Sequence, residues 1–331
     1  MKRDEVVRLS WDGKARALRP EAEGPPPLVF SAENGRGRLL HGDNRAALAS
    51  LCPELSEKVT LAYLDPPFLT NRAHEAIVQS DAPKSGPLKA RAKRFAFDDR
   101  WSSKAAYLEA LGQRLVLVRD LLAPHGSVVI HVDTKTSHYV KVLCDEIFGD
   151  DAFASEIVWR YRRWPSKTPN FQRVHDVLLR YRKDPKGKPR FNVPYEPLAP
   201  STLATWGTNK QRAVFEDDGR RARSSTTAEA TKGVPMGDVW DIGVIAPVSR
   251  ERTGYPSQKP ELLLERIITA LSDPGEIVLD PYMGSGTTPA VAARLGRTFI
   301  GIDASDVAVE VATDRLEALG VQFVRSVARS A

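Results

Sequence analysis

The chain has 331 residues, 42% of them hydrophobic, with a formal net charge of +6 and two cysteines. This length suggests one large α/β domain with insertions or roughly two domains, and no run approaches the ~18 apolar residues of a membrane span. The start lacks the apolar core of a secretory signal, and Cys52 and Cys144 stand in unrelated contexts, which argues against a disulfide framework and a zinc site and favours a reducing cytosol.

The first half of the chain alternates apolar runs of strand length with stretches of helical spacing. Residues 1–36 are polar and rich in Pro and Gly, and we interpret them as an N-terminal arm. The elements then predicted are a strand over 37–42, a helix over 44–51, a buried strand over 59–64, a long basic loop over 69–103, a helix over 104–122, a strand over 127–132, a helix over 139–148 and strands over 156–161 and 177–181.

In the second half, residues 183–246 are polar, show no sustained period and suggest an inserted, loop-rich or partly disordered module. Regular patterns return at Pro260. They predict a helix over 262–271, a strand over 276–279, a glycine loop over 280–288, a helix over 288–295, a strand over 298–302 and a helix over 305–319. Repeated strand, loop and helix units predict a parallel sheet with right-handed crossovers.

The tetrapeptide Asp65-Pro66-Pro67-Phe68 directly follows the buried strand over 59–64. Two consecutive prolines cannot continue a central strand, because neither has an N–H for the ladder. Asp65 is therefore expected at the carboxyl edge of the sheet, where open parallel sheets bind ligands. A carboxylate, proline carbonyls and a flat aromatic ring can together hold a planar group that carries an NH2. A plain Pro-rich turn is the alternative.

A second motif, Asp280-Pro-Tyr-Met-Gly284-Ser-Gly286-Thr-Thr288, lies between a strand and a helix, and Asp303 ends the next strand. Glycines let the backbone approach a ligand, and a strand-terminal acid at this spacing suits ribose hydroxyls. A dinucleotide fingerprint would need a third glycine where Pro289 stands, and no P-loop Gly-Lys-Ser/Thr is present. A carboxylate at position 280 would repel phosphate but suits a cationic sulfonium, so S-adenosylmethionine fits better than NAD or ATP.

These motifs resemble the β-class (permuted) amino-group DNA methyltransferases, the DNA adenine-N6 and cytosine-N4 methylases. The resemblance covers roughly residues 37–182 and 254–319. It rests on Gly42-Asp43-Asn44, Asp65-Pro66-Pro67-Phe68, Thr253-Gly-Tyr-Pro-Ser-Gln-Lys-Pro260, Asp280–Thr288 and Gly301-Ile302-Asp303. Two residues depart from the family pattern. Tyr282 stands where Phe is usual, and Phe68 replaces the commoner Tyr.

The resemblance implies a Rossmann-like S-adenosylmethionine-dependent methyltransferase fold, an α/β architecture with a mostly parallel twisted sheet flanked by helices and an inserted target-recognition region. Its implied domains are an arm (1–36), a catalytic half (37–182), the insert (183–250) and a donor-binding half (251–331). The implied reaction is methyl transfer to the exocyclic amine of a flipped-out base in duplex DNA.

The resemblance also assigns roles. Asp65 and the Pro66 carbonyl would accept hydrogen bonds from the target amine beside Pro67, and Phe68 would stack on the base. Asp43 would contact the donor adenine, Asp303 its ribose, and Asp280 its methionine part. The remaining residues implied around the donor are Asp65, Ser257, Gln258, Lys259, Tyr282, Gly284, Ser285, Gly286 and Thr287. No metal is implied.

Positive charge is concentrated in residues 84–104 and 160–190. Basic residues between Trp159, Tyr161 and Trp164 suit phosphate neutralisation with base stacking, although a solvated strand face with a buried Trp fits the same pattern. Asn209 to Arg212 are candidates for reading base edges in the insert. The predicted DNA contacts are Lys89, Arg91, Lys93, Arg94, Arg160, Arg162, Arg163, Lys167, Arg173, Lys210 and Arg212.

Other residues fit simpler roles. His131 and His138 are expected to be structural, and Asp133 could line the pocket or cap the next helix. The first-position Asp of the Asp65 motif favours adenine N6 over cytosine N4. Alternatives are a non-catalytic DNA-binding module, an NAD-dependent oxidoreductase and a methyltransferase acting on RNA or protein. Expected partners are double-stranded DNA, a second copy of the chain and a cognate restriction endonuclease, with no membrane and with a cytoplasmic, nucleoid-associated location.

Overall fold

The computed structural model describes residues 8–11, 14, 24–79, 91–163, 165, 167 and 169–327. These residues form two compact units. The large unit holds residues up to 191 and from 238 onward, and the insert unit holds residues 192–237. Each unit is described by itself.

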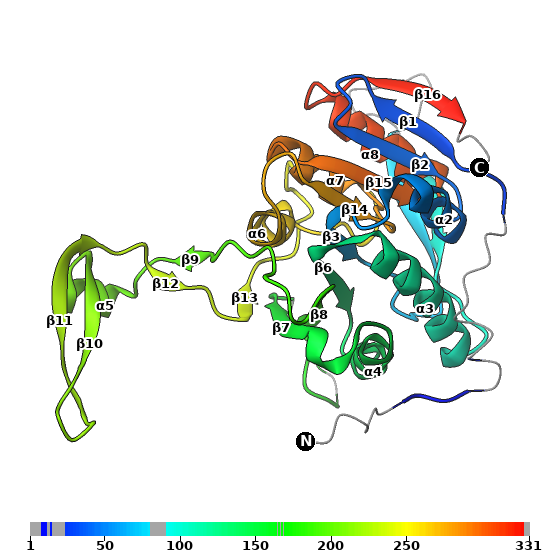
Figure 1. Cartoon of the computed structure of the whole chain (residues 1–331). Helices are drawn as coiled ribbons and strands as arrows, with labels where there is room; N and C mark the ends of the chain where they lie inside the picture. The colour runs from blue at the N-terminus through cyan, green and yellow to red at the C-terminus, as the bar shows by residue number, and fades with distance from the viewer. Residues whose placement is uncertain are drawn as a thin grey trace. The chain divides into compact units, whose positions relative to one another are not determined.

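A ten-stranded sheet forms the centre of the large unit (Figure 1). Its strands lie side by side in the order β13-β7-β8-β6-β3-β14-β15-β2-β1-β16. In that order their bounds are Val239–Asp241, Phe153–Arg160, His175–Arg182, Leu122–Val132, Val59–Leu64, Ile277–Asp280, Thr298–Asp303, Gly37–His41, Leu28–Ala32 and Phe323–Val327.

The five central strands β6, β3, β14, β15 and β2 run parallel to one another. Their carboxyl ends therefore meet at one edge of the sheet. β3 from the first half of the chain and β14 from the second half are neighbours in register. This pairing brings the two predicted motifs to one edge, and the predicted mostly parallel α/β sheet is confirmed.

Helices cover both faces of the sheet (Figure 1). On one face α2 packs on α3 and α3 on α4, and on the other α6 packs on α7 and α7 on α8. Their bounds are Asn44–Leu55, Lys104–Leu121 and Ser137–Phe148 for α2, α3 and α4, and Glu261–Leu271, Thr287–Arg294 and Asp306–Glu317 for α6, α7 and α8. A single 3-10 turn, η1 (Asp150–Ala152), follows α4.

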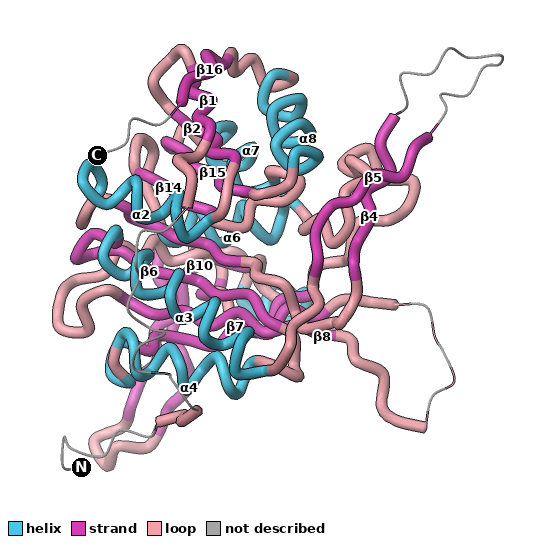
Figure 2. The backbone as a smooth tube through the Cα atoms, turned by 90° about the vertical axis from the view of Figure 1, so that its right-hand side faces the viewer, coloured by secondary structure: helices cyan, strands magenta, loops and turns pink. Residues whose placement is uncertain are grey.

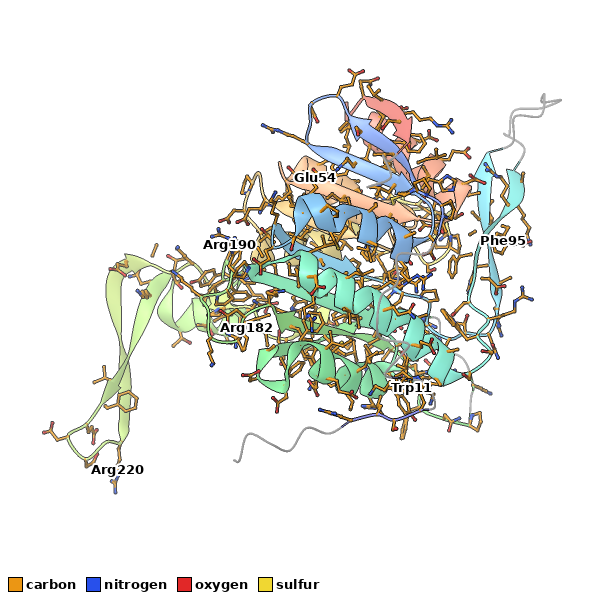
Figure 3. All side chains as sticks on the ribbon, turned by 45° about the vertical axis from the view of Figure 1, so that its right-hand side comes forward. Trp11, Glu54, Phe95, Arg182, Arg190 and Arg220 are labelled. Atoms are coloured by element: carbon orange, nitrogen blue, oxygen red, sulfur yellow. The ribbon has the colours of Figure 1, made fainter. Side chains whose placement is uncertain are left out.

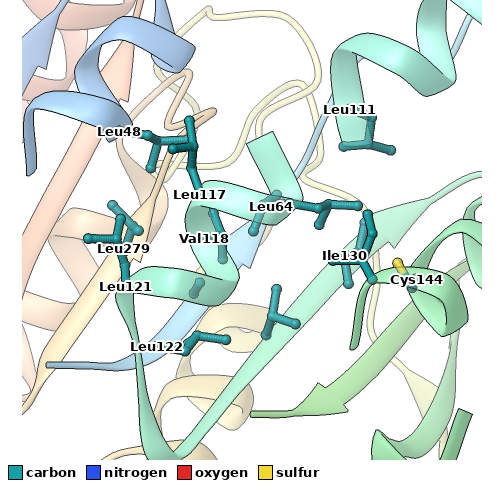
Figure 4. Packing of buried hydrophobic residues seen from close by; sticks show 14 of the residues in the cluster. Leu48, Leu64, Leu111, Leu117, Val118, Leu121, Leu122, Ile130, Cys144 and Leu279 are labelled. Carbon is teal, nitrogen blue, oxygen red and sulfur yellow. The ribbon is translucent and has the colours of Figure 1, made fainter. Parts of the chain in front are cut away.

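The main hydrophobic core lies between the sheet and α2, α3 and α4 (Figure 4). Successive residues of a strand point to opposite faces, so Leu64 of β3 and Ile130 of β6 pack into this core with Leu111 of α3. Tyr63 and His131, one position away on the same strands, lie outside this cluster and are also fully buried. β3 is buried at every position, as its continuous apolar run predicts.

The predicted loop over 69–103 is wrong in its secondary structure. It contains an antiparallel hairpin of β4 (Ala73–Gln79) and β5 (Arg91–Asp98), drawn beside the main body in Figure 2. The basic residues of β5 and the polar residues of β4 interrupt the hydrophobic alternation that would predict two strands. Residues 80–90 lie outside the described residues.

Two strands at one end of the sheet, β1 and the edge strand β16, are absent from the predicted elements. β1 lies inside the segment interpreted as an arm, and β16 lies after the last predicted helix. β1 pairs antiparallel with β2, which follows it closely in the sequence, and with β16 from the other end of the chain.

The insert unit contains regular elements that its irregular composition does not predict. β9 (Tyr195–Glu196) pairs with β12 (Val234–Pro235), α5 spans Pro200–Trp206, and β10 (Asn209–Phe215) pairs with β11 (Arg221–Ala230). Arg220 lies in the turn of the β10–β11 hairpin (Figure 3). The unit is narrower than the predicted insert over 183–250, since residues 238–250 belong to the large unit.

Within the described residues, no helix combines the length and apolarity that crossing a bilayer requires.

Candidate active site

A cavity of about 300 Å³ opens at the carboxyl edge of the sheet, between the ends of β3 and β14. Its volume lies at the lower end of the range for small-molecule sites, about 300–1,000 Å³. Both predicted motifs contribute to it. The predicted residues that line it are Asp43, Asp65, Pro66, Pro67, Phe68, Ser257, Gln258, Lys259, Asp280, Tyr282, Gly284, Ser285, Thr287 and Asp303.

Asp65 lies where β3 ends and forms an ion pair with Lys259. Lys259 is only 8% exposed, so this pair is largely shielded from water. The two oxygens of Asp65 differ: Oδ2 accepts a hydrogen bond from Lys259 Nζ, whereas Oδ1 has no hydrogen-bond partner among the described residues. A buried acceptor without a partner costs desolvation free energy. A bound substrate that donates a hydrogen bond to this oxygen would remove that cost.

The loop after Phe68 is held by Asp99, a nearly fully buried residue at the end of β5. Its carboxylate accepts hydrogen bonds from the backbone of Leu69 and Thr70 and from the Thr70 hydroxyl. Leu69 has a positive φ of 56°, a conformation that costs energy for a branched side chain and needs support from its surroundings. The Asp99 hydrogen bonds supply that support and fix the turn that carries Phe68.

The glycine loop after β14 is built around Asp303. The backbone N–H of Gly284 donates to Asp303 Oδ2 at 2.9 Å, and that of Ser305 donates to Oδ1 at 2.9 Å. Gly284 has a φ of 49° and faces Tyr255, so both its conformation and the space favour glycine. Burial raises the pKa of Asp303 above its usual value.

Gly286 does not line the cavity, in contrast to the other predicted donor-loop residues. It precedes α7 with a φ of 71°, and a Cβ at this position would lie 2.6 Å from the Cβ of Ala312 in α8. Its glycine therefore serves the close packing of two helices.

Asp280 is almost completely buried at the end of β14. Burial raises its pKa to about 7, a hydrogen bond from Thr288 opposes the shift, and the nearby charges of Asp65 and Asp303 add to it. The Tyr282 N–H also donates to Asp280 Oδ1, at 2.9 Å. The groups among the described residues that shift the pKa of Asp280 include no cation, so its carboxylate is complementary to a ligand that brings a positive charge.

Asp43 caps α2, because its Oδ1 accepts from the N–H groups of Arg45 and Ala46. Arg114 of α3 donates to Asp43 Oδ2 at 3.0 Å and to the Asn44 side chain at 2.6 Å. Asn44 also donates to the carbonyl of Pro281, which ties the start of α2 to the glycine loop.

The loop 253–259 adopts its shape through Gln258. Its Oε1 accepts from the Thr253 N–H and hydroxyl, and its Nε2 donates to the Glu251 carbonyl. Ser257 has a positive φ of 54°. The predicted residue Gln258 is thus engaged inside its own loop while also lining the cavity.

The sequence reasoning missed an aromatic wall of the cavity. His74 of β4 stacks on Phe97 of β5 with ring centroids 4.5 Å apart, and Phe97 stacks on Tyr255 at 6.4 Å. His74 and Phe97 come from the segment assigned to a loop, so the hairpin pairing brings them together, and Tyr255 comes from the loop 253–259. Asn44, Thr70 and Asp99 line the same cavity.

His131 is predicted to be structural, and Asp133 is predicted either to line the pocket or to cap the next helix. His131 lies 3.5 Å from Asp65 Oδ1 and contacts the Phe68 ring. Asp133 caps the turn before α4 by accepting from Lys135 and Thr136, and it is not among the residues lining the cavity.

Several predicted DNA-contact residues pair with acidic side chains within their own unit. The described pairs are Lys93–Glu75, Arg94–Glu310, Arg160–Asp241, Arg173–Asp133 and Lys210–Glu229. Arg163 donates to the Tyr161 hydroxyl, and Arg162 and Lys167 are exposed. Lys89 and the side chains of Arg91 and Arg212 lie outside the described residues.

The predicted stacking aromatics are inside the protein. Trp159 is 3% exposed and donates to the Ile242 carbonyl, and Tyr161 is 5% exposed. They are therefore core residues and not stacking platforms for bases, while Trp164 lies outside the described residues. Arg160, Arg162 and Arg163 instead line a second cavity of about 580 Å³ with Tyr161.

Across the described ranges, no cluster of three or more His, Cys, Asp or Glu side chains is arranged to hold a metal ion.

Comparison with known proteins identifies the family. The family model described as DNA methylase matches residues 59–314. The chain is 28% identical to the DNA adenine methyltransferase YhdJ of Escherichia coli K12, over 89% of this chain and 86% of that protein. It is 27% identical to the Type II methyltransferase M.EcaI of Enterobacter cloacae, over 84% of this chain and 68% of that protein.

Solved structures support the fold. The M1.HpyAVI-SAM complex superimposes with a TM-score of 0.53 at 21% identity, covering 85% of this chain and 98% of that one. The PvuII DNA methyltransferase, named as cytosine-N4-specific, superimposes with a TM-score of 0.54 at 17% identity, covering 88% and 89%. The cavity, which combines an unpartnered Asp65 oxygen with a buried Asp280, fits a cationic methyl donor beside a hydrogen-bond-donating amine. The chain therefore belongs to the N6/N4 DNA methylase family and is a DNA methyltransferase that uses S-adenosylmethionine.

Proposed function

We propose that the protein methylates the exocyclic N6 amine of adenine within a defined sequence of duplex DNA. The observation that carries this proposal is the single cavity shared by Asp65, Pro66 and Phe68 on one side and by the glycine loop on the other. The adenine assignment is supported by the first-position Asp of the Asp65 motif and by the relative from E. coli that is named as a DNA adenine methyltransferase.

The donor would lie along the carboxyl ends of β2, β14 and β15. Asp303 would accept hydrogen bonds from its ribose, Asp43 would lie by its adenine, and Asp280 would face its positive charge. Ser257, Gln258, Lys259, Tyr282, Gly284, Ser285 and Thr287 line the same cavity and would surround the rest of the molecule. When bound, S-adenosylmethionine supplies the methyl group.

On the substrate side, an exocyclic amine is a weak nucleophile because its lone pair is delocalised into the ring. Asp65 Oδ1 and the Pro66 carbonyl would accept its two protons, which draws the nitrogen toward tetrahedral geometry and frees the lone pair. Phe68 would stack on the base after it leaves the duplex. The residues would act mainly by positioning and electrostatics.

The insert unit, residues 192–237, is the proposed target-recognition region. Its β10–β11 hairpin carries Lys210 and Arg220, both exposed. A small unit with its own pairing can present side chains to base edges without disturbing the catalytic sheet. Relatives named as Type II methyltransferases support a cognate restriction endonuclease as a further partner, and a homodimer stays an expectation that size measurement in solution would test.

The decisive experiment incubates the full chain with methyl-labelled S-adenosylmethionine and unmethylated genomic DNA, then identifies the labelled nucleoside by mass spectrometry. N6-methyladenine is expected. N4-methylcytosine would replace the adenine assignment with the cytosine one, and the absence of any labelled nucleoside would refute the proposal.

The matched variant is Asp65→Asn, which preserves size but removes the charge. We expect transfer to be abolished while the donor dissociation constant changes little. Because Lys259 loses its buried counter-ion, the melting temperature should fall, so binding is measured below the transition of the variant. Full activity of this variant would contradict the role given to Asp65.

A further inference from the structure

A chain of buried polar groups leads away from Asp65 toward β6 and β8. His131 of β6 is fully buried, and its Nδ1 lies 2.9 Å from the Tyr63 hydroxyl and 3.5 Å from Asp65 Oδ1. Its Nε2 lies 3.3 Å from Asp176 Oδ2 on β8. A buried histidine held between two carboxylates is an expensive arrangement for a residue that only fills space.

These contacts define the proton positions on the ring. Asp176 accepts and cannot donate when ionised, so Nε2 carries the hydrogen. Nδ1 then carries no hydrogen, and its lone pair accepts a hydrogen bond from the Tyr63 hydroxyl. Nδ1 also lies 3.5 Å from Asp65 Oδ1, the oxygen that lacks a hydrogen-bond partner among the described residues, because Lys259 engages the other oxygen. The Tyr63 hydroxyl has to rotate away from Nδ1 before that lone pair can take a proton from Asp65.

The carboxylate of Asp176 can stabilise the protonated imidazole of His131. Burial raises the pKa of Asp176. The hydrogen bond and charge of His131 and the hydrogen bond of Tyr161 lower it by more, so the net pKa is below the usual value. The Tyr161 hydroxyl donates to Asp176 Oδ1 at 3.0 Å, which leaves Oδ2 for the histidine. A carboxylate that orients an imidazole and stabilises its protonated form is the arrangement used by general-base triads.

Among the described residues, the other groups packed around His131 bring no positive charge into direct contact with it. The edge of Trp159 on β7 and the tilted ring of Phe68 close two sides. Lys259 approaches from the opposite side of Asp65, on Oδ2. The titratable groups facing the ring are thus Tyr63, Asp65 and Asp176, with Lys259 beyond Asp65.

We propose that His131, oriented by Asp176, takes up the proton that the target amine loses during methyl transfer. The inference rests on the proposed function, because methylation of an NH2 group must release one proton. The amine N–H bond breaks as an O–H bond forms on Asp65 Oδ1. That O–H bond then breaks as an N–H bond forms on His131 Nδ1, which restores the Asp65 carboxylate and places the positive charge beside Asp176. His131 is therefore a proton-accepting and positioning residue, in a pair with Asp176.

The test uses His131→Gln in the full chain, since glutamine can keep a hydrogen bond to Asp176 but cannot take up a proton. His138→Gln is the matched control, because His138 is exposed at the start of α4. Single-turnover methyl transfer to duplex DNA is measured from pH 6 to pH 9, together with the dissociation constants for donor and DNA and the melting temperature.

We expect His131→Gln to slow single-turnover transfer by roughly 10- to 100-fold, within the range for lost acid–base assistance. The dependence of the transfer rate on pH should differ from that of the wild type, whereas both dissociation constants should stay within about twofold of the wild-type values. Asp176→Asn should lower the rate in the same direction, and the double variant should be no slower than the slower single variant, because the two residues act as one unit.

Two results would overturn the inference. One is a wild-type rate and pH profile in His131→Gln. The other is a rate loss that is uniform with pH and parallels weaker donor binding or a lower melting temperature, which is the signature of a structural role. In either case wild-type methylation of DNA persists, so the proposed function stands independently of this outcome.

Discussion

Asp280 and Asp303 lie at the ends of adjacent strands and line the same cavity as Asp65. Burial raises the pKa of both Asp280 and Asp303, and that of Asp280 reaches about 7. The unfolded chain releases the same proton near pH 3.9. Native protein therefore binds more protons than unfolded protein between these values, and Asp280 reduces stability progressively as the pH rises from about 4 to 7.

The same shift makes donor binding depend on pH. A cationic ligand is favoured by the ionised form of Asp280, so the donor dissociation constant should rise as the pH falls from 8 to 6, by up to about tenfold per unit below pH 7. Isothermal titration calorimetry across this range measures the effect.

Asp280→Asn is the matched variant, because an amide oxygen can still accept the Tyr282 N–H. It should bind the donor more weakly at pH 8 and lose most of the pH dependence. An unchanged slope in this variant would assign the pH dependence to another group.

At the scale of elements, the start of α7 shows how the glycine motif serves the fold. Gly286 precedes the helix in a left-handed conformation and packs against Ala312 of α8. The two helices thereby approach each other closely, and the loop between β14 and α7 keeps the shape that presents Gly284 to Asp303.

Gly286→Ala should lower the free energy of unfolding by about 1–3 kcal/mol, because the added Cβ meets Ala312 and adopts an unfavourable φ. Chemical denaturation measures this change. Combining it with Ala312→Gly removes the contact with the Cβ but leaves the Cα of residue 312 2.9 Å from the added Cβ, and it does not relieve the backbone strain. The Ala312→Gly change costs about 1 kcal/mol by itself in a helix. The double variant should therefore be more stable than the sum of the two single effects predicts, and strict additivity would show that the contact is not the cause.

The elements that the sequence predicted well are those with local signals. β3 and β14 are continuous apolar runs, and α3 begins at Lys104 after Ser103, whose hydroxyl accepts from the Ala106 N–H. The β4–β5 hairpin and the strands β1 and β16 lack such signals. β16 in addition pairs with β1, which lies near the other end of the chain.

For the whole molecule, we propose that the large unit and the insert unit have different functions. Residues 192–237 make most of their contacts within themselves, and the cavity is lined by large-unit residues. Catalysis and donor binding would then belong to the sheet, and choice of DNA sequence to the insert.

Replacing residues 192–237 by a short Gly/Ser linker should leave the far-ultraviolet spectrum of the sheet and the donor dissociation constant nearly unchanged. Affinity for the specific DNA site should fall to the non-specific level, a loss of roughly a thousandfold or more. Titration of labelled duplexes and sequencing of methylated positions check both results. Deleting only the turn 217–219 of the β10–β11 hairpin is the milder control, and persistence of the wild-type methylation pattern after the full replacement would contradict the assignment.

The sequence by itself determined the chemistry of the site and the type of fold. Asp65-Pro66-Pro67-Phe68, the glycine motif and Asp303 carry local signals: strand ends, residues with special backbone freedom and carboxylates at fixed spacing. These features depend on neighbours within a few residues, so they can be inferred from the chain alone.

Only the tertiary structure decided which groups meet at Asp65. Lys259 lies 194 residues away in the sequence, His131 comes from β6 and Asp176 from β8. Two rings of the aromatic wall, His74 and Phe97, come from the β4–β5 hairpin, and the third, Tyr255, comes from the loop 253–259. Strand order and register place these side chains, and both are set by burial and hydrogen bonding between segments far apart in the chain. A pattern of local residues does not encode those pairings, which is why the surroundings of the reactive carboxylate emerged from the fold.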